Sequence, residues 1–124
     1  MTTTETTETI EIEAIIDTYF AMWNEGDRAK RLGLIAQAWT DDAHYVDPLS
    51  DVTGHEGLAD MVDGVRAQFP GATLQRTSAL DLHHKVVKFG WSATGADGAL
   101  IVGGTDIAVI APDGRLTALA GFFS

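Results

Sequence analysis

Asp106 is the residue whose chemical type fits its surroundings least. It lies in LIVGGTDIAVI (residues 100–110), the most apolar stretch of the chain. A carboxylate in such a stretch is costly unless it is hydrogen-bonded, paired with a charge or kept protonated by a raised pKa. A carboxyl group that keeps its proton near neutral pH can donate a hydrogen bond or take part in proton transfer. The alternative is that Asp106 is a structural carboxylate, since buried acidic residues are structural about as often as they are catalytic.

Two more polar residues occur where apolar patterns dominate. Asp47 precedes Pro48 at the end of a short predicted strand, although Asp-Pro is also a common turn-forming pair. Tyr19 lies on the apolar stripe of the first predicted helix, where a tyrosine is usually part of the core. Together with Asp106 they offer two carboxyl groups and one phenol from three different elements. Whether Asp47 faces inward stays open, because the turn could aim it either way.

The histidines do not form a pattern that binds metal. His83 and His84 are adjacent in the sequence, and neighbours in extended chain point to opposite faces, so at most one can enter a pocket. The chain has no cysteine and no His-x-x-x-His spacing. Gly103 and Gly104 fall inside a predicted strand, not between a strand and a helix, so no phosphate-binding loop is indicated. We therefore expect no metal and no cofactor.

Three helices are predicted in the first 70 residues. Residues 1–9 are rich in Thr and Glu and are expected to be flexible, and an apolar stripe at three- and four-residue steps starts at Ile10. A second helix starts after Asp27, a good N-cap, and ends near residues 41–42. A short strand at residues 43–47 stops at Pro48. A third helix follows residues 53–56, which have the spacing of a capping box.

The rest of the chain is predicted to form strands at residues 73–82, 85–94, 99–111 and 116–123. The third of these is apolar on both faces, as expected of a covered central strand. Helices followed by a meander of long strands indicate an α+β domain, residues 10–124, in which three helices pack on a curved, mostly antiparallel sheet. Such a rolled sheet tends to leave a concave apolar cavity. The residues expected to line it are Trp23, Trp39, Tyr45, Met61, Phe69, His83, Phe89, Trp91 and Phe122.

The overall charge limits the classes of partner that we expect. The 124 residues include 18 acidic and 8 basic side chains, for a net charge of -10. This charge would repel phosphate backbones and anionic membrane surfaces, so neither nucleic acid nor membrane is an expected partner. No apolar run is long enough to cross a membrane and no leader pattern precedes the first helix, so we expect a cytoplasmic location.

The order of these motifs resembles the nuclear transport factor 2-like superfamily and, within it, the SnoaL-like proteins. The resemblance is carried by residues 19–27 (YFAMWNEGD), 39–48 (WTDDAHYVDP), 54–58 (GHEGL), 69–71 (FPG), 83–84 (HH), 104–106 (GTD), 113–116 (DGRL) and 121–122 (GF). It implies a cone-shaped fold, a homodimer and a deep apolar cavity. The superfamily holds several enzymes and non-enzymatic members, so the fold alone does not fix the function.

Within the superfamily, ketosteroid isomerase is similar in its catalytic residues. Its oxyanion-hole tyrosine falls on Tyr19, its general-base aspartate on Asp47, and its protonated oxyanion-hole aspartate on Asp106. The resemblance therefore implies that Asp47 removes a proton next to a carbonyl while Tyr19 and protonated Asp106 stabilise the enolate oxygen. Polyketide cyclases of the SnoaL type also point to Asp106 as an acid or base.

Three hypotheses follow. The first is a cofactor-free enzyme that isomerises or cyclises a small apolar carbonyl compound by proton transfer. The second is a non-catalytic protein that binds a small apolar ligand in the same cavity. The third is a dimeric structural protein without turnover, in which Asp106 is satisfied by fixed neighbours and has no open space beside it.

Overall fold

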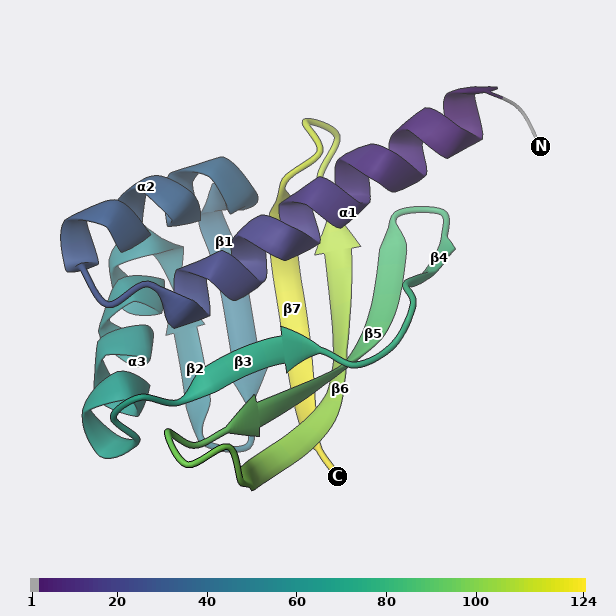
Figure 1. Cartoon of the computed structure of the whole chain (residues 1–124). Helices are drawn as coiled ribbons and strands as arrows, with labels where there is room; N and C mark the ends of the chain where they lie inside the picture. The colour runs from purple at the N-terminus through teal and green to yellow at the C-terminus, as the bar shows by residue number, and fades with distance from the viewer. Residues whose placement is uncertain (1–2) are drawn as a thin grey trace.

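The computed structural model describes residues 3–124, and Met1 and Thr2 lie outside the described residues. Helix α1 (Thr3–Asn24) runs across one face of the sheet (Figure 1). Its inward stripe contains Ile12, Ile16, Tyr19 and Trp23, all buried. These residues recur every three or four positions, so one side of the helix is apolar throughout its second half. Tyr19 is thereby fixed in the core, facing the sheet.

The first helix is longer than its apolar stripe predicts. We expected a flexible segment at residues 1–9 and a helix from Ile10, but α1 begins at Thr3. The early turns gain a contact with the sheet, because Glu8 forms an ion pair of 2.8 Å with Lys85. Charged contacts of this kind leave no apolar periodicity in the sequence. The apolar stripe therefore covers only the later turns of α1, and the helix predicted from it begins too late.

Helix α2 (Arg28–Ala38) begins at the predicted cap, because the Asp27 carboxylate accepts a hydrogen bond of 3.0 Å from the Lys30 N–H. It ends at Ala38, three residues earlier than predicted. Strand β1 (Trp39–Asp47) starts there, since Trp39 is already extended and is paired with Leu116. The predicted strand, residues 43–47, is only the second half of β1. Pairing with a strand far along the chain decides this boundary.

Strand β2 (Ser50–Thr53) was not predicted. It pairs with β1 in an antiparallel hairpin and leads into helix α3 (Gly54–Gln68). Thr53 is the N-cap residue of α3, but its side chain makes no capping hydrogen bond, so the predicted capping box is wrong in that detail. The hairpin turn follows directly after Asp47 and fixes where that side chain points.

The remaining strands are β3 (Thr73–Arg76), β4 (Asp81–His83), β5 (Val86–Thr94), β6 (Leu100–Ile110) and β7 (Leu116–Phe123). The order in the sheet is β2-β1-β7-β6-β5-β3, with β4 also paired to β5. Only the β1–β7 pair is parallel among the described strands. The predicted strand at residues 73–82 is broken into β3 and β4.

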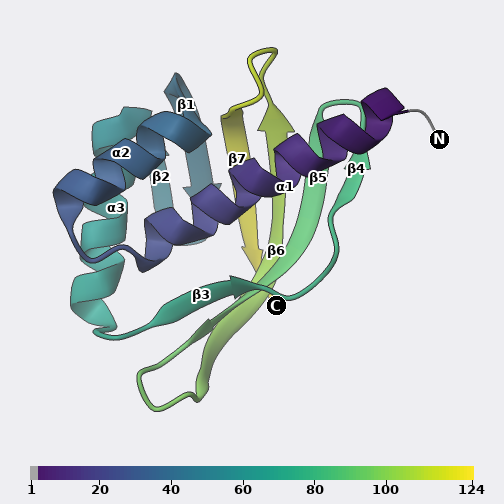
Figure 2. The same cartoon turned by 45° about the horizontal axis from the view of Figure 1, so that its top comes forward.

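The sheet curves around α1. Irregularities in the pairing occur between Ala93 and Thr94 and between Val109 and Ile110, and such bulges increase the local bend. Figure 2 shows β5 and β6 bending beneath α1 so that β3 passes below the helix. The predicted α+β cone, with three helices on a curved, mostly antiparallel sheet, is confirmed.

No element of the described residues covers the outer face of the sheet. Strand β6 was expected to be covered on both faces, yet Ile107 and Val109 are 38% and 39% exposed. Phe122 on the neighbouring strand is 54% exposed. All three helices lie on the other face (Figure 2). The prediction of a doubly covered strand is therefore wrong for the single chain.

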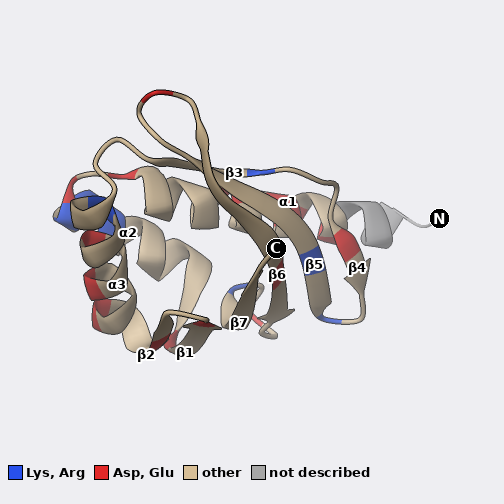
Figure 3. Ribbon diagram, turned by 90° about the horizontal axis from the view of Figure 1, so that it is seen from below, with Lys and Arg blue, Asp and Glu red and all other residues tan. Residues whose placement is uncertain are grey.

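Ion pairs between side chains join helices α2 and α3. Arg31 is buried, and its guanidinium pairs with Asp63 and donates to the carbonyl of Glu25. Arg28 pairs with the same Asp63 carboxylate and with Glu56. Figure 3 shows the acidic positions of α3, in red, beside the basic positions of α2, in blue. Within the described residues, no helix is long and apolar enough to cross a membrane.

Candidate active site

Tyr19 and Asp106 meet inside the cone. The Tyr19 hydroxyl donates a hydrogen bond of 2.9 Å to Oδ2 of Asp106, across 87 residues of sequence. Both residues are almost fully enclosed, with 2% and 3% of their surface exposed. Helix α1 supplies the phenol and strand β6 supplies the carboxyl group. Two of the three predicted site residues are therefore in direct contact.

A glycine in the neighbouring strand makes room for this carboxyl group. Gly121 is paired with Asp106 in the sheet. A Cβ at Gly121 would lie 2.9 Å from Oδ1 of Asp106 and 3.4 Å from Cβ of Asp47. The first of these distances is shorter than a van der Waals contact. Gly121 thus keeps space for both carboxyl groups at one point of the sheet.

The pKa of Asp106 is raised. Burial raises it to about 7, because the charged form loses its hydration inside the core. The hydrogen bond from Tyr19 acts in the opposite direction, and the nearby charge of Asp47 adds a small increase. Near neutral pH this carboxyl group therefore exists in both protonation states, as suits a general acid or base.

Asp47 lies at the rim of the same cavity. Its Oδ2 accepts a hydrogen bond of 2.7 Å from the Tyr45 hydroxyl, and its Oδ1 accepts one of 2.8 Å from the Leu49 N–H. Tyr45 precedes it by two positions, so both side chains lie on the same face of β1. The open question about the direction of Asp47 is thereby answered, because it is among the residues that line the cavity.

Both tyrosines stay protonated over the physiological range. Burial and the charge of Asp106 raise the pKa of Tyr19 well above its ordinary value, and the Trp23 N–H acts in the opposite direction. Burial and the charge of Asp47 likewise raise the pKa of Tyr45. The site therefore consists of two phenol–carboxyl pairs, Tyr19–Asp106 and Tyr45–Asp47.

The cavity that these pairs share has a volume of about 110 Å³. Besides the three predicted site residues, four of the predicted wall residues line it: Trp23, Tyr45, Phe69 and Trp91. Sequence reasoning missed ten further wall residues: Leu49, Ser50, Val65, Gln68, Ala72, Leu74, Ala93, Ile101, Val102 and Phe123. Most of them lie at the ends of elements, where the apolar period gives no sign of an opening.

Five predicted wall residues lie elsewhere. Trp39 and Phe89 are enclosed in the core behind the Tyr19 ring, with ring centroids 5.9 and 6.1 Å from it. Met61 is packed in the core on α3. Phe122 points to the outer face, because it follows the inward-facing Gly121 in the strand.

His83 is the fifth. It is exposed at the end of β4 and its ring packs on His84, with ring centroids 5.7 Å apart. Neither histidine lines the cavity, so the expectation that one of them would point inward is wrong. Among the side chains that the structure describes there is also no group of three metal-ligating residues.

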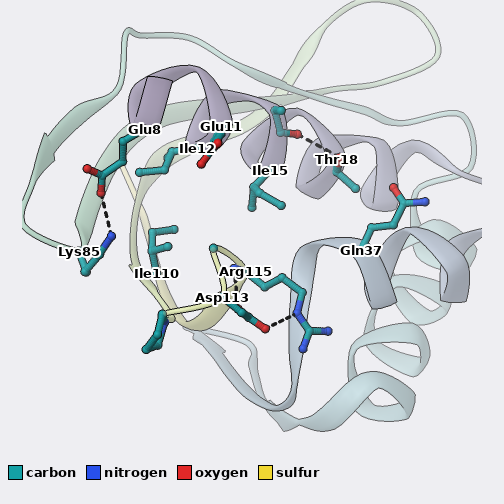
Figure 4. A pocket seen from close by; sticks show the side chains of 13 residues that line it. Glu8, Glu11, Ile12, Ile15, Thr18, Gln37, Lys85, Ile110, Asp113 and Arg115 are labelled. Carbon is teal, nitrogen blue, oxygen red and sulfur yellow. Dashed lines mark hydrogen bonds and ion pairs between the residues drawn. The ribbon is translucent and has the colours of Figure 1, made fainter. Parts of the chain in front are cut away.

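A second, larger hollow of about 500 Å³ lies between the first half of α1 and the turn that joins β6 to β7. Its rim is charged, and Figure 4 shows Glu8 paired with Lys85 and Asp113 paired with Arg115. Tyr19, Asp47 and Asp106 do not line it. The candidate site is therefore the smaller apolar cavity.

Comparison with known proteins identifies the family of this fold. The family model of the SnoaL-like domain matches residues 16–119. The chain belongs to the SnoaL-like family. Among the curated proteins, none matches this SnoaL-like chain.

Solved structures agree with the family. A protein from Agrobacterium tumefaciens, described as a "putative isomerase of the SnoaL-like family", is 35% identical and has a TM-score of 0.87. The match covers 93% of this SnoaL-like chain and 98% of that protein. A "putative polyketide cyclase" from Sinorhizobium meliloti is 14% identical, with a TM-score of 0.69 over 87% of this chain and 93% of that one. At this lower identity the likeness shows the fold alone.

Proposed function

We propose that this SnoaL-like protein is a cofactor-free acid–base enzyme that acts on a small apolar carbonyl compound. One observation carries the proposal: the buried Tyr19–Asp106 pair and Asp47 line one apolar cavity. A phenol and two carboxyl groups in a low-dielectric pocket are suited to moving a proton between carbon atoms. The cavity volume of about 110 Å³ suits a compound with a single six-membered ring.

Each group has a proposed role. Asp47, as the carboxylate, removes a proton from the carbon next to the carbonyl. When the ligand binds, the Tyr19 hydroxyl exchanges its hydrogen bond to Asp106 for one to the ligand oxygen. Tyr19 and protonated Asp106 then both donate to this oxygen, which becomes negative as the enolate forms. In a β,γ-unsaturated ketone the resulting dienolate takes the same proton back from Asp47 at its γ-carbon, so the double bond moves into conjugation and the carboxylate of Asp47 is regenerated. The reaction is balanced without a cofactor.

Isomerisation is favoured over aldol-type cyclisation. The relative from Agrobacterium tumefaciens, whose description names an isomerase, shares 35% of its residues with this chain over nearly the full length. The likeness to the cyclase from Sinorhizobium meliloti is weaker. Cyclisation of a longer substrate would use the same Asp106 as acid or base, and it is the alternative reaction within this proposal.

A second candidate is a binding protein without turnover. Both oxygens of Asp47 already accept hydrogen bonds, from Tyr45 and from the Leu49 N–H. A base held in this way must give up part of that stabilisation to take a proton. In a binding protein the same groups would only hold a polar ligand atom in place.

The test uses cyclohex-3-enone, whose isomerisation to the conjugated enone is followed by ultraviolet absorbance. We expect wild-type turnover, a loss of about 100-fold to 10,000-fold in kcat for Asp47→Asn, and a loss of about 100-fold for Tyr19→Phe. Asp51→Asn is the matched control, because Asp51 lies on the same hairpin but is exposed and pairs with His44. Unchanged kcat in Asp47→Asn would contradict the proposed base. Thermal stabilisation of the wild type by phenol without any turnover would favour the binding protein.

A further inference from the structure

The described residues contain three buried indole N–H groups without a hydrogen-bond partner, those of Trp23, Trp39 and Trp91. Buried polar groups are nearly always paired, so each exception requires an explanation. Trp39 is enclosed in the core, whereas Trp23 and Trp91 line the cavity that holds Asp106. An unpaired donor on a cavity wall is explained if the missing acceptor belongs to a ligand.

Trp23 is placed next to the phenol of the site. It follows Tyr19 by one helical turn on the same face of α1, and only 4% of it is exposed. Its ring lies 6.1 Å from the ring of Tyr45, measured between centroids. Burial raises the pKa of Tyr19 most, and the Trp23 N–H partly offsets this effect, so the N–H is near the phenol oxygen. Even so, it makes no hydrogen bond to any described residue.

The other donors of the site are already engaged. Tyr19 gives its hydrogen to Asp106, and Tyr45 gives its hydrogen to Asp47. An indole N–H is a donor only, and it does not depend on pH in the physiological range. Trp23 therefore carries a donor that no described residue uses, and it lies on the wall of the cavity together with Tyr19.

We propose that Trp23 donates a hydrogen bond to the oxygen of the ligand, as a third donor beside Tyr19 and Asp106. The ligand class is then a small flat molecule that carries an acceptor oxygen, such as an enone or a phenol. This inference rests on the proposed function, since it takes the same cavity and the same oxygen. It adds a residue that positions the ligand by a contact independent of proton transfer.

Trp91 is less suited to this contact. A Cβ on Gly104 would lie 2.8 Å from Cζ2 of Trp91, so this ring lies directly over the backbone of β6. Gly104 is two residues before Asp106 along the strand, whereas Trp23 is on the helix beside Tyr19. Trp39, buried and equally unpaired but absent from the cavity wall, serves as an internal reference.

The first experiment records the indole ¹H–¹⁵N signals of the wild type during titration with phenol or toluene. The two compounds have nearly the same shape, and only phenol has an oxygen. Trp23→Phe and Trp91→Phe assign the signals by their disappearance. We expect phenol, and not toluene, to move the Trp23 proton signal downfield, while the Trp39 signal stays in place. Movement of the Trp91 signal alone, or equal movement with toluene, would overturn the assignment to Trp23.

The second experiment measures affinity. Trp23→Phe should weaken phenol binding about twofold to tenfold, the range for a hydrogen bond between neutral groups, and change toluene binding much less. Trp39→Phe removes a comparable ring from the core and should change the phenol-to-toluene affinity ratio little. Equal weakening for both compounds in Trp23→Phe would show that Trp23 contributes shape only.

The outcomes separate this inference from the proposed function. If cyclohex-3-enone is converted while phenol leaves the Trp23 signal in place, the inference is wrong and the enzyme proposal stands. If phenol moves the signal but the enone is not converted, the ligand class is supported and the catalytic proposal is wrong.

Discussion

Replacing Asp106 with asparagine should stabilise this protein in mildly alkaline solution. Burial raises the pKa of Asp106 to about 7 from an ordinary value of 3.8. Between these two pH values the folded protein holds a proton that the unfolded chain has released. The free energy of unfolding therefore falls as the pH rises from about 4 to about 7.

The size of this effect follows from the two pKa values. At about 1.4 kcal/mol for each pH unit, ionisation of Asp106 costs the folded protein about 4 kcal/mol once the pH is well above 7. Asparagine is neutral at every pH, has the same shape and can still accept the hydrogen bond from Tyr19. Wild type and Asp106→Asn should therefore differ by about 1 kcal/mol or less below about pH 4. Above about pH 8 the variant should be more stable by up to about 4 kcal/mol.

The assay is urea unfolding, followed by tryptophan fluorescence, of both proteins over a series of pH values. The free energies of unfolding are compared at each pH, so that the titration of other groups cancels. Asp113→Asn is the control, because hydrogen bonds from the Arg115 N–H and guanidinium lower the pKa of Asp113, so its difference from the wild type should change only below about pH 4. A difference between wild type and Asp106→Asn that is constant from pH 4 to pH 8 would refute the reasoning from burial.

Three more predictions concern the packing and the surface. Gly121→Ala places a Cβ 2.9 Å from Oδ1 of Asp106 and should lower the free energy of unfolding by about 1–3 kcal/mol. Gly33→Ala in α2, where a Cβ would have no atom within 4 Å, should raise it by up to about 1 kcal/mol, and thermal unfolding measures both changes. Asp63→Ala leaves Arg31 buried without its carboxylate and should cost about 2–4 kcal/mol in urea unfolding, and Arg31→Met in the same chain should recover part of it. The homodimer implied by the family resemblance would cover the exposed outer face, where Ile107 is 38% exposed. Sedimentation equilibrium should therefore give twice the chain mass of 13.2 kDa for the wild type and the monomer mass for Ile107→Glu. A monomeric wild type at micromolar concentration would contradict this prediction.

Much of the secondary structure follows from local pattern. The apolar stripe predicts α1, the Asp27 cap predicts the start of α2, and the alternation of apolar and polar residues predicts β5. The turn at residues 112–114 predicts the start of β7. The errors occur where a distant partner decides the local state. Trp39 leaves the helix because it pairs with Leu116, and the early turns of α1 gain a contact with Lys85. No local window of sequence contains these contacts.

The candidate site divides in the same way. Asp106 is conspicuous in the sequence because a carboxyl group in an apolar strand must be satisfied or kept protonated, and this follows from residue type alone. The sequence also limits Asp106 to one face of β6. The phenol that meets it, 87 residues away, and the direction of Asp47 depend on strand register and on the turn at Leu49. The choice of wall residues, with Phe123 inside and Phe122 outside, depends on the same register, because a shift of one residue exchanges the two faces of a strand.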